Sequence, residues 1–260
     1  MIKPAFLKAQ VAKAKARRRT PPFLRRLVAQ AVDATARAHY GEAYSTKCLQ
    51  AAKALQTALD RFGIGGRLWM GAFCSVEVYA AIGHDTWGGF WGAEHHVWFV
   101  TSFNELVDLS IAELPRHPRQ KRADGIAMPA IWWNDMGAPL TVFRYLPDAV
   151  VSTIQFPDQA DMDDLAAFEA AVLERLDTML ATMDVAEIAF GPLLESSDHA
   201  QQLHEQGHPW LNRAIRFQDL AIPFPPWVTL RSREIREAHE AGLPLPSRLS
   251  SDPTLVARDE

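Results

Sequence analysis

One helix followed by one hairpin constrains the fold of this chain more than any other stretch. Residues 48–62 carry apolar side chains at helical spacing, and the glycine-rich residues 63–66 end the helix. Residues 97–101 and 106–109 are short apolar runs on either side of a polar turn, the pattern of a β-hairpin. We therefore expect a helix that packs against an antiparallel sheet.

Cys48 stands at the start of that helix. Ser45 or Thr46 is expected to cap the helix, which places Cys48 in its first turn. Free backbone N–H groups and the positive helix end favour a thiolate there, and a thiolate attacks a carbonyl carbon. The other cysteine, Cys74, falls on the apolar face of a strand expected over residues 67–80, so we interpret it as a core residue.

His96 and Asp108 are expected on the two strands of the hairpin. A three-residue connection is expected to set them directly opposite each other, and a five-residue connection to set them diagonally. Both arrangements leave the β-carbons on one face, about 4.5–8 Å apart. The carboxylate would then orient an imidazole that takes the proton of Cys48. His95 points to the opposite face and is expected to be an exposed polar residue.

At these positions the sequence resembles the transglutaminase-like superfamily of papain-like thiol enzymes. That family has a Cys at a helix start, then a His followed by an apolar and an aromatic residue, then an Asp at the end of the next strand. Cys48, His96-Val97-Trp98 and Val107-Asp108 match this order. The helix and the residues after it are also similar to small bacterial members that process peptides, including lasso-peptide leader peptidases. The resemblance covers residues 40–112.

The resemblance implies an α+β papain-like core, with a nucleophile helix packed on an antiparallel sheet. It implies a catalytic triad of Cys48, His96 and Asp108 that forms an acyl-enzyme from an amide, ester or thioester, without a cofactor or a metal. Peptidase, deamidase, transglutaminase and acyltransferase reactions fit these residues equally well. A peptide or protein substrate is the expected partner. The alternative class is a non-catalytic interaction protein that keeps the fold.

Three tryptophans are candidate substrate-binding residues: Trp87, Trp91 and Trp98. The first two lie in a glycine-rich aromatic stretch, residues 83–92. One interpretation is a mobile flap that closes over substrate. The other is a loop whose indoles cover the edge of the sheet.

A rival motif stands in the C-terminal half. His204-Glu205-Gln206-Gly207-His208 satisfies the H-E-x-x-H pattern of zinc peptidases, which needs both histidines on one helical face. Gly207 weakens a helix, and Pro209 disfavours helical backbone at His208. Zinc chemistry is therefore the minor alternative, and two surface histidines at a helix end are the main interpretation.

Charge and composition suggest three segments. Residues 1–30 hold nine Lys and Arg and no acid, while the other 230 residues hold 18 basic and 31 acidic side chains, a net charge of −13. We expect a basic N-terminal arm (1–22), a catalytic core (23–156) and a mainly helical C-terminal region with a polar tail (157–260). The arm either packs on the acidic body or binds an anionic partner.

The number of cysteines and the length of the apolar runs indicate the cellular location of the protein. Two cysteines cannot form a disulfide framework, and no apolar run approaches the roughly 20 residues of a membrane span. No secretory signal pattern is found at the start. We therefore expect a soluble, cytoplasmic protein.

Overall fold

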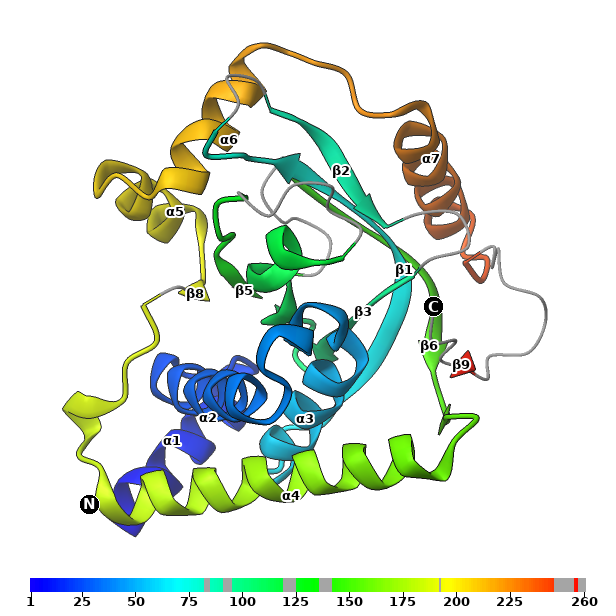
Figure 1. The fold of residues 1–260 in the computed structure, drawn as a ribbon. Coiled ribbons are helices and arrows are strands. Elements are labelled where there is room, and N and C mark those ends of the chain that lie inside the picture. Colours follow the sequence, from blue (N-terminus) through cyan, green and yellow to red (C-terminus); the bar gives the residue numbers. More distant parts are fainter. Residues whose placement is uncertain are drawn as a thin grey trace.

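Figure 1 shows the chain, a computed structural model, as helices arranged around a strongly curved sheet. The structure describes residues 1–81, 85–90, 95–118, 125–135, 142–191, 193–245 and 255–256. The helices are α1 (Pro4–Arg17), α2 (Pro22–Tyr40), α3 (Cys48–Asp60), α4 (Gln159–Thr182), α5 (Ser197–Glu205), α6 (Pro209–Asp219) and α7 (Pro226–Glu240), with 3-10 turns η1 (Gly41–Thr46), η2 (Ser110–Arg116) and η3 (Val185–Glu187). The strands are β1 (Gly66–Glu77), β2 (Thr86–Phe90), β3 (His96–Thr101), β4 (Leu106–Asp108), β5 (Ala130–Trp133), β6 (Phe143–Val151), β7 (Ile154–Gln155), β8 (Leu193–Leu194) and β9 (Leu255–Val256). The α+β class expected from the sequence is present.

The larger sheet is built around β1, which pairs with three other strands. Along one edge, residues 66–71 of β1 pair with β3 and residues 73–77 pair with β2. The other edge pairs with β6, and a register shift between Met70 and Gly71 interrupts that pairing. From β3 the sheet continues through β4 and β5 to β8. The pair β5–β8 is parallel, so the sheet is not wholly antiparallel as expected.

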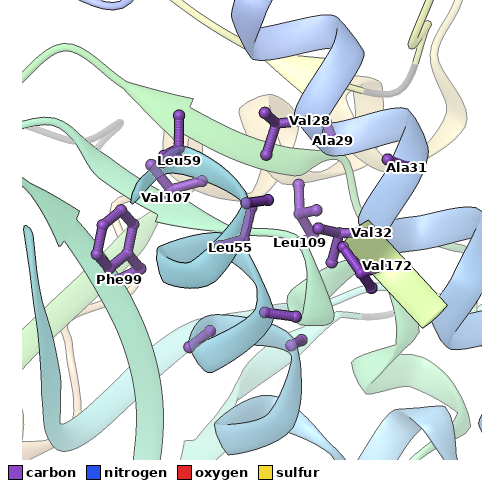
Figure 2. Packing of buried hydrophobic residues seen from close by; sticks show 14 of the residues in the cluster. Val28, Ala29, Ala31, Val32, Leu55, Leu59, Phe99, Val107, Leu109 and Val172 are labelled. Atoms are coloured by element: carbon purple, nitrogen blue, oxygen red, sulfur yellow. The ribbon is translucent and has the colours of Figure 1, made fainter. Parts of the chain in front are cut away.

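Helices cover both faces of this sheet. Val97 and Phe99 of β3 pack with side chains of α2, α3 and α4, whereas Trp98 and Val100 pack with side chains of α5 and α6. This alternation follows from the period of two residues along a strand. Figure 2 shows how α2, α3, α4 and the strands meet in the first cluster, through Val28, Val32, Leu55, Leu59, Phe99, Val107 and Val172.

The three expected segments share one body. In Figure 1, α1 lies beside one end of α4, where the backbone N–H of Ile2 donates to the carbonyl oxygen of Leu180 at 3.2 Å. The first hydrophobic cluster contains residues from Ile2 to Leu193, and β8 extends the sheet. Residues from all three expected segments therefore pack in one hydrophobic cluster. No helix in the described ranges is long and apolar enough to cross a membrane.

A buried ion pair joins α2 to the turn between β3 and β4. Nη2 of Arg25 donates to Oε1 of Glu105 at 2.6 Å, and each side chain is 1% exposed. Glu105 also accepts from the backbone N–H and hydroxyl of Thr20 and from the hydroxyl of Thr101. Arg25 further donates to the carbonyl oxygen of Thr20 and to Asn134. These bonds compensate the loss of water around two buried charges, and they hold the turn against α2.

We expect Arg25→Met to lower the free energy of unfolding by roughly 3–5 kcal/mol, because it leaves the Glu105 carboxylate buried without its counter-charge. The double variant Arg25→Met/Glu105→Gln should cost less than the sum of the single changes, since the two residues interact directly. Arg233→Gln is the control, because its ion pair with Glu237 is exposed. Urea unfolding of the wild type, both single variants, the double variant and the control measures these five free energies of unfolding. A small loss for Arg25→Met would contradict the role given to the pair.

Candidate active site

Cys48 is the first residue of α3, at the end where backbone N–H groups have no intrahelical partner. Its side chain is half-buried. The cap expected at Ser45 or Thr46 is wrong, because both residues belong to η1. Lys47 takes the N-cap position, and no side chain within the described residues caps the helix. The first-turn N–H groups therefore remain suited to an anion beside Cys48.

The hydrogen bond expected between His96 and Asp108 is present. Nε2 of the imidazole lies 2.5 Å from Oδ2 of the carboxylate. The connecting turn spans residues 102–104, and Asn104 adopts a left-handed conformation with φ of 65°. The strand register, continued by one residue, sets Asp108 opposite Trp98 and diagonal to His96. The two side chains share a face as expected, but the expectation that a three-residue turn sets them directly opposite is wrong.

The Asp108 carboxylate accepts four hydrogen bonds and is 3% exposed. Oδ2 accepts from Nε2 of His96 and from the hydroxyl of Tyr145 at 2.9 Å. Oδ1 accepts from the backbone N–H of Ser110 at 3.1 Å and from its hydroxyl at 2.8 Å. Tyr145 comes from β6 and Ser110 begins η2, so three elements fix the carboxylate in one orientation.

Aromatic side chains surround the imidazole of His96, which is fully buried. Phe90 of β2 lies parallel to it, with ring centroids 5.6 Å apart and an interplanar angle of 8°. Phe73 and Trp98 also contact the ring. These contacts leave the imidazole little freedom to rotate away from Asp108.

The pKa of His96 reflects opposing influences. Burial lowers it, but the charge and hydrogen bond of Asp108, together with Cys48, outweigh burial and raise the pKa to about 10. Its imidazole is therefore protonated at neutral pH and donates from Nε2 to Asp108.

The second ring nitrogen, Nδ1, completes the arrangement. It is buried and has no hydrogen-bond partner of normal geometry within the described residues. Cys48 nevertheless acts on the ring both through charge and as a hydrogen-bonding group. Asp108 thus holds one nitrogen of the imidazole, and Cys48 lies near enough to influence the pKa of the ring.

His95 lies in a different environment. Its Nε2 is 3.9 Å from Oδ2 of Asp148, and its side chain is 18% exposed. Asp148 in turn pairs with the buried Arg231 of α7 at 2.5 Å. His95 therefore interacts with a carboxylate of β6 that is itself paired with α7, and it is less exposed than the sequence suggested.

The three tryptophans predicted to bind substrate lie in different environments or outside the described residues. Trp87 is on β2, so the loop or flap expected over residues 83–92 is wrong for residues 86–90, which pair with β1. Its indole packs on Phe217 and Phe224 and donates to the carbonyl oxygen of Ile222 at 3.3 Å. Trp98 is fully buried, so its side chain forms part of the core and has no surface to offer a substrate. Trp91 lies outside the described residues.

The pattern that suggested zinc is split between two helices. His204 lies in α5, which ends at Glu205, while His208 is the N-cap of α6. Nδ1 of His204 is 2.6 Å from Oδ1 of Asn212, and Nδ1 of His208 accepts the backbone N–H of Leu211. The single helical face that the motif requires is therefore missing. Across the described ranges, no three His, Cys, Asp or Glu side chains are grouped so that they could hold a metal.

Sequence reasoning missed Ser110, Tyr145 and Phe90. Ser110 had a local signal, because a serine two residues after an aspartate is typical of an Asx-type turn. Tyr145 had none, since it is 37 residues from Asp108 along the chain. Phe90 was obscured by its glycine neighbours. Gly89 has φ of 138°, and a side chain there would collide with the carbonyl oxygen of Phe73, so this glycine lets β2 pair closely with β1.

We compared the chain with known proteins. Neither a protein-family model, nor a curated protein sequence, nor a solved structure matches the chain.

We expect the pH dependence of stability to reveal the His96–Asp108 pair. The pKa of His96 is raised from 6.5 to about 10 in the folded protein. The resulting stabilisation is complete below the unfolded value and is lost as pH rises through the folded value. The free energy of unfolding of the wild type, relative to that of Asp108→Asn, should therefore fall between pH 7 and pH 10.

Urea unfolding at four pH values over that window measures the difference. His95→Ala serves as the control and should keep the slope of the wild type. If the free energy of unfolding of the wild type minus that of Asp108→Asn stays constant or grows towards pH 10, the imidazole is not held in its charged form.

Proposed function

We propose that the protein is a thiol-dependent hydrolase or acyltransferase, related in mechanism to the transglutaminase-like superfamily, that acts on an amide, ester or thioester carbonyl. The observation that carries this proposal is the buried imidazole of His96, bonded to Asp108 at Nε2 and influenced by Cys48. Nucleophile, base and orienting group in this relation are the signature of covalent catalysis by a thiol.

In the first half of the proposed reaction, the thiolate of Cys48 attacks the carbonyl carbon and forms a carbon–sulfur bond. The carbonyl π electrons move to oxygen and give a tetrahedral oxyanion. As that intermediate collapses, Nδ1–H of His96 gives its proton to the leaving amine, alcohol or thiol, and an acyl-thioester remains on Cys48. The backbone N–H of Cys48, at the uncapped start of α3, is a candidate donor to the oxyanion.

In the second half, neutral Nδ1 of His96 takes a proton from water, or from an amine or other acceptor, as that molecule attacks the thioester. The carbon–sulfur bond breaks, and the sulfur leaves as a thiolate beside the newly protonated imidazole. The resting ion pair is restored, and no oxidant, reductant or cofactor enters the balance. The choice between hydrolysis and transfer depends on which acceptor reaches the acyl group.

Asp108 supports both halves by holding the imidazole in one orientation. Its own position is set by Tyr145 and Ser110. Because His96 is fully buried while Cys48 is partly exposed, the carbonyl group would approach from the Cys48 side. A peptide or protein, which can present a backbone or side-chain amide at a surface, is the substrate class that we propose.

We expect Cys48 to react with iodoacetamide at neutral pH much faster than Cys74. Cys74 is fully buried, and burial raises the pKa of its thiol to about 12. Peptide mapping after timed labelling measures both rates, and Cys74 should label only when the protein unfolds. Intact-mass analysis after incubation with acyl-thioester and peptide pools should show an acyl adduct that Cys48→Ala abolishes. Slow labelling of Cys48 with no adduct would favour the non-catalytic interaction protein.

We expect Asp108→Asn to lower turnover by roughly 10- to 1,000-fold while the fold is kept, less than the loss of about 10⁴ known for a serine triad, because a thiol is intrinsically more nucleophilic. His96→Ala should cost at least as much, and the double variant little more, because the two residues act as a unit.

His95→Ala and His204→Ala are the matched controls, and both should retain activity, in the presence of a chelator as in its absence. Steady-state hydrolysis of the best substrate from the adduct screen supplies the rates. If His95→Ala proved as damaging as His96→Ala, the assignment of the base would be wrong.

A further inference from the structure

Apolar side chains of the N-terminal helix α1 pack on the body. Phe6 meets Phe23 of α2 edge to face, with ring centroids 5.0 Å apart. Ala14 is fully buried, and Leu7 and Val11 are partly buried against the first hydrophobic cluster. These apolar contacts fix the helix to the protein.

Most cations of residues 1–30 are exposed and have no ion-pair partner in the part of the chain that the structure describes. Seven exposed basic residues form no ion pair with any described residue: Lys3, Lys8, Lys13, Lys15, Arg17, Arg18 and Arg19. By contrast, Arg25 and Arg26 of α2 both pair with Glu195. Since residues 1–30 contain no acid, nothing within the segment offsets this charge. We name these seven residues the cationic surface.

A hollow of about 360 Å³ adjoins the cationic surface, between α1, the C-terminal end of α3 and α4. Its apolar walls are Pro4, Leu7, Val11, Phe62 and Leu180, and its two cations are Lys8 and Arg61. Arg61 is paired with Asp177 at 3.0 Å, whereas Lys8 belongs to the unpaired set. The hollow thus offers apolar contact beside a free positive charge.

We propose that the cationic surface and this hollow bind an acidic polypeptide segment that carries an aliphatic side chain. Carboxylates of the segment pair with the exposed cations of α1, and the aliphatic side chain enters the hollow beside Lys8. α1 is about 21 Å long from its 14 residues, which matches a short peptide segment rather than an extended polymer.

Two observations favour a polypeptide over a nucleic acid. The aromatic residues of this region, Phe6, Phe23 and Phe62, are packed against the body, so none offers a free ring on which a base would stack. Residues 31–260 carry a net charge of −13, which repels any polyanion long enough to extend beyond α1.

The binding surface is separate from the candidate active site. Cys48 begins α3, whereas Arg61 and Phe62 of the hollow follow its end, and 13 helical residues span about 20 Å. The proposal therefore stands whether or not Cys48 is catalytic, and its test measures binding rather than turnover.

The experiment uses the full chain and fluorescence anisotropy of labelled probes of about six residues, whose extended length of about 20 Å matches that of α1. A peptide of glutamate and leucine should bind, with an affinity that falls as salt rises. Lys8→Gln/Lys15→Gln should weaken its binding about fivefold or more, because two exposed charge pairs are lost. Arg233→Gln/Arg236→Gln removes the same charge from exposed positions on α7 and should bind like the wild type. Thermal unfolding verifies that all variants fold.

Three further probes decide the chemistry. A glutamate–serine peptide should bind more weakly than the glutamate–leucine peptide, and equal binding would overturn the role of the hollow. A lysine–leucine peptide should not bind, and its binding would overturn the role of charge. Oligo(dT) of the same length should bind more weakly than the glutamate–leucine peptide, and tighter binding would identify a nucleic-acid surface instead. Equal loss of binding in the α1 and α7 variants would overturn the proposed location.

Discussion

The buried pair of Arg25 and Glu105 sets the relation between the two layers on which the site depends. Glu105 closes the β3–β4 turn, and Arg25 belongs to α2, so the hairpin is tied to the helical layer at its turn end. The other end of the hairpin carries His96 and Asp108. Two charges that are each 1% exposed would be costly without compensation. Thr20, Thr101 and Asn134 supply the compensating hydrogen bonds. A change in the angle between α2 and the hairpin would break these bonds, which is why the layers keep one arrangement.

At the other end of the hairpin, the Asp108 carboxylate is also buried and is also stabilised by several hydrogen-bond donors. A buried carboxylate is stable only when donors replace the water that it has lost, and four donors surround this one. The donors come from β3, η2 and β6, so the carboxylate also links elements that are distant in the sequence. The charge that raises the pKa of His96 is thus held by bonds that stabilise the fold. Structure and proposed chemistry share the same residues here, and removal of the carboxylate affects both.

Local patterns were sufficient to predict the helix that starts at Cys48, the two strands of the hairpin and the face that His96 and Asp108 share. These depend on periods of 3.6 and 2 residues, which the sequence displays directly. The helix cap was mispredicted because Ser45 and Thr46 hydrogen-bond within η1 instead. Tyr145 lies beyond local reasoning, because β6 meets β1 on the edge opposite β3 and only the curvature of the sheet brings Tyr145 to Asp108. The burial of Trp98 was predictable, since it shares a strand face with His96, which also points inward.

Helix α3 connects the candidate active site to the hollow beside α1. One end presents Cys48, and the other leads into Arg61 and Phe62, which line the hollow beside α1. Its core-facing residues, Leu55 and Leu59 among them, are fully buried, so α3 cannot shift without disturbing the first hydrophobic cluster. The separation of about 20 Å between its ends is therefore fixed by packing. An extended chain advances about 3.3 Å per residue, so a single polypeptide in contact with both places needs at least about six residues between them. A shorter acidic peptide would occupy the α1 surface and leave Cys48 accessible.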